Sequence, residues 1–219
     1  MATRRTLTRP PRRPAADKFD DRRAELASAA LETLAELGYA RTSLREIAQH
    51  TEFSHGVLHY YFADKYELIM FCVRQYKAAC VKRYDEIVAS ATTARELAHG
   101  FSRGMAATLR ADATLHRLWY DLRTQSLFEP SFRADVADID GSLERMIWRI
   151  VGEYASLARG ELRVTSPLAY AMFDGAFEQA LRHHLHGHRD AGAQLVRHVE
   201  QLLTDHVLAP PRRRGRLRA

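Results

Sequence analysis

The chain lacks the features that mark membrane proteins and disulfide-bonded secreted proteins. It contains no run of about 18 apolar residues and no signal sequence, so we expect a cytoplasmic protein that does not span a membrane. Only two cysteines occur, and Cys72 and Cys80 stand on one expected helix, too far apart along its axis to form a disulfide. Both are expected to be buried thiols.

The chain also lacks the short motifs of the common enzyme classes. No G-x-S-x-G, P-loop, G-x-G-x-x-G or H-E-x-x-H sequence is present, so we expect no catalytic residue and no cofactor. A small helical enzyme is a remote alternative, for which His116 and Asp121 are the available titratable groups. No metal is expected at the histidine cluster 183–188 either. His184 and His188 have i, i+4 spacing, but Gly187 should end the helix between them, which favours a solvated or dimer-edge histidine patch.

Strand-like alternation is absent too, and the pattern that is present is helical. Apolar residues recur every three or four positions between capping residues, which predicts an all-α fold of about nine helices. The net charge of +6 is uneven, since residues 1–23 and 210–219 each carry a net charge of +5. Basic ends on a mildly acidic body favour sequence-independent contact with DNA phosphates.

Three capping patterns predict two short helices and the start of a third. Ser43-x-x-Glu46 and Asp64-x-x-Glu67 are capping boxes, and Ser54 between them is a further N-cap candidate. The turn between the first two helices is tight. Such a pair of short helices is a candidate helix-turn-helix.

The second short helix has two different faces. Leu58 and Phe62 share one side and are expected to pack on Leu44 and Ile47 of the first helix. The other side carries small, aromatic and imidazole groups, namely His55, Gly56, Val57, His59, Tyr60 and Tyr61. Such a face suits a DNA major groove, because the backbone can approach closely and methyl, hydroxyl or imidazole groups can reach base edges or phosphates.

This segment, over roughly residues 20–70, resembles the DNA-binding domain of the tetracycline-repressor (TetR) family. The residues that match the family pattern are Gly38, Tyr39, Thr42, Ser43, Leu44, Ile47, Ala48, Ser54, Gly56, Leu58, Tyr60, Phe62 and Lys65. Three positions depart from it: Glu52 replaces the usual Gly of the turn, Val57 a common Thr, and His59 a common aromatic residue. At Glu52 we expect a distorted turn or strain at positive φ.

The resemblance implies a ligand-responsive repressor that binds a palindromic operator as a homodimer and leaves it when a small-molecule effector binds. The alternative is an activator or architectural DNA-binding protein of the same fold with no effector. We expect phosphate contacts from Ser43, Tyr61 and Lys65. Base or methyl contacts are expected from Arg45, His55, Gly56, Val57, His59 and Tyr60, and Thr42 and Ser54 complete the candidate set.

Four segments follow from these expectations. They are a basic, disordered arm at residues 1–17, a TetR-type domain at 18–70 with its motif at 43–62, an effector-binding and dimerisation domain at 71–209, and an Arg-rich disordered tail at 210–219. Bulky groups on the helices of the third segment are candidates for an effector site: Met105, His116, Trp119, Tyr120, Phe128, Trp148, Phe173 and Phe177. Ordinary core packing is the competing interpretation for each of them.

The last two helices are expected from Ser166 to about His186 and from Asp190 to about Leu208, and they carry more apolar surface than a small domain is expected to cover. In proteins of this family two such helices from each subunit form a four-helix dimer interface. The candidate interface residues are Leu168, Met172, Phe177, Leu181, Leu195, Val199 and Leu202. A two-fold pair of reading helices demands a palindromic site.

Overall fold

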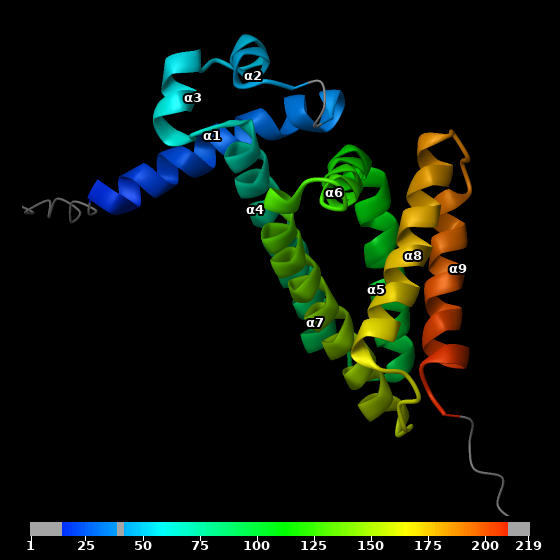
Figure 1. Ribbon diagram of the computed structural model, residues 1–219. Coiled ribbons are helices and arrows are strands. Elements are labelled where there is room, and N and C mark those ends of the chain that lie inside the picture. The colour runs from blue at the N-terminus through cyan, green and yellow to red at the C-terminus, as the bar shows by residue number, and fades with distance from the viewer. Residues whose placement is uncertain (1–14, 39–41, 210–219) are drawn as a thin grey trace, which may run out of the picture.

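Helices make up nearly all of the described chain. The computed structural model describes residues 15–38 and 42–209 (Figure 1). Its helices are α1 (Ala15–Leu37), α2 (Leu44–His50), α3 (His55–Tyr61), α4 (Lys65–Ser90), α5 (Ala94–Ala111), α6 (Ala113–Gln125), α7 (Arg133–Ala158), α8 (Ser166–Leu185) and α9 (Ala191–Gln201). The only β pairing within the described residues is an isolated bridge between Leu162 and Leu208. The all-α class is therefore confirmed.

Several boundaries differ from the expected ones. The helix α1 begins at Ala15, so the last three residues of the expected basic arm are helical. The helix α8 is capped by Thr165 rather than Ser166, which places Pro167 in its first turn, where a missing amide costs no hydrogen bond. A 3-10 turn at Pro130–Phe132 leads into α7, and a π-helical turn at Leu202–His206 follows α9.

The remaining terminal segments and one motif residue fall outside the described chain. Tyr39 and most of the two Arg-rich ends belong to residues 1–14, 39–41 and 210–219. None of the described helices combines the length and the apolar character that crossing a lipid bilayer requires.

The expected caps start α2, α3 and α4. The acceptor atoms and the amides that they bind are Ser43 Oγ with Glu46 N (3.2 Å), Ser54 Oγ with Val57 N (3.3 Å) and Asp64 Oδ1 with Glu67 N (2.8 Å). The expected strain at Glu52 is wrong, because Arg159 is the only non-glycine residue at positive φ in the described chain. The turn between α2 and α3 therefore closes without the usual glycine.

A closed apolar core holds the first three helices together. Leu26 and Leu34 of α1, Ile47 of α2 and Leu58 of α3 are fully buried, and Phe62 after α3 joins them. A helix as short as α3 is not stable by propensity and depends on such packing. Because Leu58 fixes the inner side of α3, its outer side stays available to a partner.

The long helix α4 connects the two domains without a break. Its 26 residues span about 39 Å at 1.5 Å per residue. It packs on α1, where Cys72 Sγ donates to the Ala27 carbonyl at 3.1 Å, and on α5 and α7. Cys72 and Cys80 are both buried free thiols, as expected. The helix α4 is thus a continuous link between the two domains.

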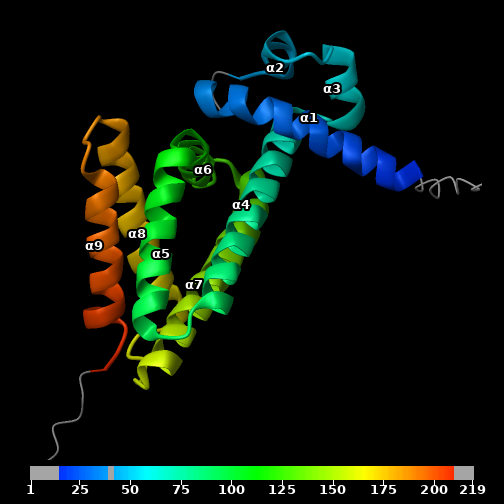
Figure 2. The same cartoon turned by 180° about the vertical axis from the view of Figure 1, so that it is seen from behind.

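The second domain is a helical bundle in which α4 and α7 lie on one side and α8 and α9 on the other (Figures 1 and 2). In both views α4 and α7 lie side by side, and α5 lies against α9 (Figures 1 and 2). The helix α8 packs on α7 and α9. The short α6 lies at the end of the bundle nearest the first domain, where it contacts α1 as well as α5 and α8. This position makes α6 the second connection between the domains.

Candidate DNA-binding surface and effector cavity

The outer face of α3 is open to solvent. His55, Gly56, His59 and Tyr60 are exposed, and Val57 and Tyr61 are half-buried at its edges. Tyr60 is 74% exposed. This face therefore presents all six residues of α3 that the sequence predicts as DNA contacts.

A groove of about 280 Å³ lies between the starts of α2 and α4 and the adjoining side of α3. Its lining residues are Ser43, Leu44, Arg45, His55, His59, Ala63, Asp64 and Lys65. Five of these come from the predicted set, so three helices bring them to one place. Arg45 and Lys65 lie in the first turns of α2 and α4, where backbone amides and the helix dipole also favour an anion such as a phosphate.

Tyr61 is not part of this groove. Its ring packs on Phe19 of α1, with 4.7 Å between the ring centroids, and Tyr60 approaches the same Phe19 at 6.1 Å. Ser43 and Lys65 therefore share a groove, whereas the third residue predicted to hold phosphate lies beside α1. The two positions suit two separate stretches of a DNA backbone.

The structure also separates two hydroxyl candidates. Thr42 is wrong as a DNA contact, because it is only 3% exposed and its hydroxyl donates to the Gly38 carbonyl at 2.6 Å. Ser54 is exposed, and its oxygen accepts the Val57 amide while its proton stays available as a donor.

A small cavity lies inside the second domain among α4, α5, α6, α7 and α8. Its volume is about 60 Å³, and it is lined by Lys77, Cys80, Tyr84, Phe101, Met105, His116, Tyr120, Leu143, Met146, Ile147, Tyr170, Phe173, Asp174 and Phe177. At about 10–15 Å³ for an enclosed water, this space holds only a few water molecules. A larger ligand must displace side chains when it enters.

Five of the eight predicted effector residues line this cavity, namely Met105, His116, Tyr120, Phe173 and Phe177. The other three do not line it. Trp119 is buried but does not line the space, and Phe128 is 78% exposed because α6 ends at Gln125 before reaching it. Trp148 follows the lining residue Ile147 on α7 and is rotated from it by about 100° around the helix.

Apart from His116 and Tyr120, the polar residues of the cavity were missed by the sequence analysis. The position of Lys77 was the easiest of these to predict from the sequence, because Val73, Lys77, Cys80 and Tyr84 follow helical spacing along the buried face of α4. This spacing places Lys77 on the buried face of the helix, so its burial could have been predicted. Asp174 gave no comparable signal, since its partners are on other helices.

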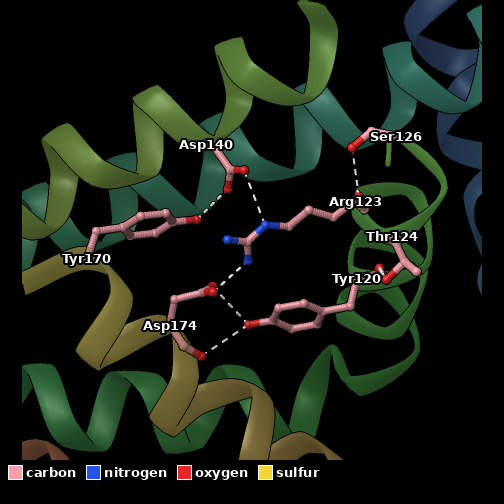
Figure 3. A network of polar contacts seen from close by, with 7 residues as sticks. All are labelled: Tyr120, Arg123, Thr124, Ser126, Asp140, Tyr170 and Asp174. Atoms are coloured by element: carbon pink, nitrogen blue, oxygen red, sulfur yellow. Dashed lines mark hydrogen bonds and ion pairs between the residues drawn. The ribbon is translucent and has the colours of Figure 1, made fainter. Parts of the chain in front are cut away.

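A network of polar contacts connects α6 to α7 and α8 at one side of the cavity (Figure 3). Arg123 of α6 binds Asp140 of α7 at 3.2 Å and Asp174 of α8 at 2.5 Å. Tyr120 donates to Asp174 at 3.0 Å, and Tyr170 donates to Asp140 at 2.6 Å. Burial, reinforced by Asp174, raises the pKa of both phenols above the usual value, so both remain protonated donors.

Four of the seven predicted dimer-interface residues are covered within one subunit: Phe177, Leu181, Leu195 and Val199. The reason is that α9 packs its apolar side on α5, and Phe177 turns into the cavity. The other three lie at the surface. Leu168 is 50% exposed, and Met172 and Leu202 line a groove between α8 and α9.

A short helix held outward on a three-helix domain, beside a groove with two cations, is the arrangement of helix-turn-helix DNA-binding proteins. Attached to a separate helical domain, it defines a DNA-binding transcriptional regulator. Residues 26–70 match the family model of the bacterial regulatory proteins, tetR family. The chain therefore carries a TetR-family DNA-binding domain, which confirms the resemblance. No curated protein matches the chain.

Solved structures share the fold over most of the chain. FadR from Bacillus subtilis, in complex with stearoyl-CoA, has a TM-score of 0.70 at 19% identity over 84% of this chain and 98% of that one. A TetR transcription regulator from Haloarcula marismortui has a TM-score of 0.71 at 16% identity over 87% and 100%. A transcriptional regulator from Saccharomonospora viridis, in complex with choline, has a TM-score of 0.67 at 15% identity over 87% and 100%. At these identities the likeness establishes the fold alone.

Proposed function

We propose that this protein is a repressor that binds a palindromic operator as a homodimer and leaves it when a small molecule enters the cavity of the second domain. The observation that carries the proposal is the position of α6. His116 and Tyr120 of α6 line the cavity, and α6 also packs on α1 of the DNA-binding domain. A ligand that displaces α6 therefore displaces α1.

The contact between α6 and α1 is close at the end of α1. Gly38 terminates α1 at a φ of 76°, and Asp121 Oδ2 of α6 lies 3.6 Å from the position that a Cβ would take there. Effector binding then works as a population shift, favouring a dimer whose α3 helices no longer fit successive major grooves about 34 Å apart.

A selection from random-sequence DNA, followed by binding to the selected duplex, tests the regulator. We expect two inverted half-sites, a stoichiometry of two subunits per duplex, and retention of binding at physiological salt. Equal, steeply salt-dependent binding to selected and unselected DNA would reject sequence-specific regulation. A single subunit per half-site without symmetry would reject the dimer.

The second candidate function is an activator or architectural protein of the same fold without an effector. The small size of the cavity, about 60 Å³, favours it, because effector sites for drug-sized molecules measure about 300–1,000 Å³. The two candidates differ in one result. Only a ligand-responsive repressor releases the selected duplex when a cavity ligand is added.

Replacing Lys65 with alanine is expected to weaken binding to every duplex and to lower the slope of log affinity against log salt by about one, as loss of one phosphate contact should. The measurement is fluorescence anisotropy across a salt series. Lys82→Ala is the matched control, because Lys82 is an exposed lysine farther along α4. An unchanged slope for Lys65→Ala removes Lys65 from the phosphate contacts.

Alanine at Val57 or His59 is expected to change base preference more than overall affinity, because both residues lie on the outer side of α3. Each good base contact contributes about 1–3 kcal/mol of discrimination. The measurement is a repeated DNA selection with each variant, with His99→Ala of α5 as the histidine control. A uniform loss over all sequences contradicts base reading by these residues.

A further inference from the structure

Lys77 is a buried cation with no acidic partner. It is 5% exposed, and its Nζ lies 3.2 Å from His116 Nδ1 and 5.3 Å from the centre of the Trp119 ring. Within the described residues no carboxylate lies within 4.0 Å of its ammonium group, although Lys77 lines the cavity. Buried lysines without a partner are rare, because removing the charge from water is costly.

The other polar groups of the cavity wall already have partners in the described chain. Tyr84 donates to Thr108 at 3.1 Å, and the remaining two tyrosines donate to the carboxylates that hold Arg123. Arg123 is paired with both carboxylates, so this network keeps one net negative charge, which acts on Lys77 from a distance. Among the lining residues of the described chain, Lys77 is the only lysine or arginine, and it has no carboxylate within 4.0 Å.

His116 adds no second charge at this position. Burial, followed by the nearby Lys77, lowers the pKa of His116 well below its usual value, so the imidazole is neutral. Because Lys77 donates to Nδ1, the ring proton is on Nε2, which faces the Tyr76 hydroxyl at 2.9 Å. One of the three ammonium protons is used in this way, and two remain for a ligand.

We propose that the effector is a monocarboxylate with an apolar body, whose carboxylate accepts hydrogen bonds from Lys77 Nζ inside the cavity. This inference rests on the proposed function in placing the effector there. The apolar body would lie against Phe101, Met105, Met146, Ile147, Phe173 and Phe177. Met105 and Met146 are unbranched and flexible, so they are the side chains that can move to enlarge the space of about 60 Å³.

The same geometry excludes other ligand classes. A cation such as choline would meet the ammonium of Lys77, and like charges in an apolar space repel strongly; the one lining carboxylate, Asp174, is already bound by Tyr120 and Arg123. A polyphosphate would bring several charges to a site with one uncompensated cation. A single carboxylate matches both the charge and the number of free donors.

Wild-type binding to matched probes tests the proposal. Hexanoate and benzoate are titrated calorimetrically beside hexanamide, benzamide and hexylamine, which keep the apolar body but change the head. We expect the carboxylates to bind about 10- to 100-fold more tightly than the amides, as a charge-assisted hydrogen bond implies, and the amine not to bind. Equal binding of acid and amide, or binding of none of the five, overturns the proposal.

A variant then assigns the head group to Lys77. In Lys77→Met, hexanoate is expected to bind no better than hexanamide, whereas Lys82→Met, an exposed lysine on the same helix, keeps the preference. Circular dichroism checks that each variant is folded. A preference for acid over amide that survives in folded Lys77→Met overturns the assignment.

The pH dependence provides an independent readout. Burial lowers the pKa of Lys77 to about 8, so hexanoate affinity should be constant near pH 7 and fall about tenfold per pH unit above 8. The titratable or charged groups facing Lys77 are Tyr76, Cys80 and Tyr84 on α4, His116, Tyr120 and Arg123 on α6, Asp140 on α7, and Tyr170 and Asp174 on α8. Burial raises the pKa of Cys80 and Tyr84 above their usual values, so neither supplies an anion near pH 7. A flat profile between pH 7 and pH 10 counts against Lys77.

Failure of this inference and failure of the proposed function give different results. If hexanoate binds through Lys77 and the selected duplex is not released, the carboxylate site stands and the effector response is rejected. If another small molecule releases the duplex and the carboxylates do not bind, the response stands and the ligand class is rejected.

Discussion

Replacing Lys77 with methionine is expected to make the ligand-free protein more stable by about 2 kcal/mol at pH 7. The pKa of this lysine falls from 10.5 to about 8 on folding because of burial, and that difference corresponds to about 3 kcal/mol. Loss of the hydrogen bond to His116 offsets about 1 kcal/mol of the gain. Methionine fills nearly the same volume without a charge, and replacements of buried charges by apolar residues are often stabilising.

The sign of the pH dependence follows from the proton count. The unfolded chain holds the lysine proton up to about pH 10.5 and the folded protein only up to about pH 8, so the unfolded state binds more protons between these values. The contribution of Lys77 to the wild-type free energy of unfolding therefore becomes more favourable as pH rises through that window. The advantage of Lys77→Met is complete below pH 8 and disappears toward pH 10.5.

Urea unfolding of wild type, Lys77→Met and the exposed control Lys82→Met at pH 7 and pH 10 measures this effect. Comparing differences between variants cancels the groups that titrate in all three proteins. A loss of stability in Lys77→Met at pH 7 would show that the ammonium has stabilising contacts within the folded chain, which would remove the reason to assign it to a ligand.

The DNA-binding domain could be predicted from the sequence because the patterns that start its helices are local. Ser43, Ser54 and Asp64 each bind an amide three residues ahead, so the start of each helix is encoded within one turn. The outer face of α3 follows from the burial of Leu58 by helical periodicity. The prediction for Thr42 was wrong because its hydroxyl binds the Gly38 carbonyl, a contact that no periodic pattern records.

The cavity and the dimer surface could be predicted only in part from the sequence, because both depend on how helices that are far apart in the sequence pack together. Lys77 and His116 are 39 residues apart, and Arg123 and Asp174 are 51 residues apart. Nothing near Leu195 or Val199 tells whether their apolar face meets α5 of the same chain or a second subunit. Periodicity identifies a face that must be covered, and tertiary packing decides what covers it.

The second large effect is expected at Gly56, the second residue of α3. A Cβ added there would meet no atom within 4 Å, the position is exposed and its φ is not positive, so the folded backbone accepts a residue other than glycine. Glycine within a helix costs about 1 kcal/mol relative to alanine, and an acidic residue in the first turn interacts favourably with the helix dipole. Gly56→Glu should therefore be as stable as wild type or slightly more stable.

DNA affinity should change in the opposite direction. If the outer side of α3 enters the major groove, the carboxylate of Gly56→Glu is forced against DNA without a partner, and like-charge juxtaposition in an interface costs several kcal/mol. We expect the affinity for the selected duplex to fall by about 100-fold or more.

Two controls isolate the cause of that loss. Gly56→Ala should retain most of the affinity, and Gly152→Glu of α7, where an added Cβ also meets nothing within 4 Å, should bind DNA like wild type. Anisotropy titrations and thermal melts of the four proteins give both quantities. A stable Gly56→Glu variant that still binds the selected duplex with wild-type affinity would mean that α3 does not read the operator. A loss of affinity without a loss of stability locates DNA recognition on the start of α3, because at this position the two effects have opposite signs.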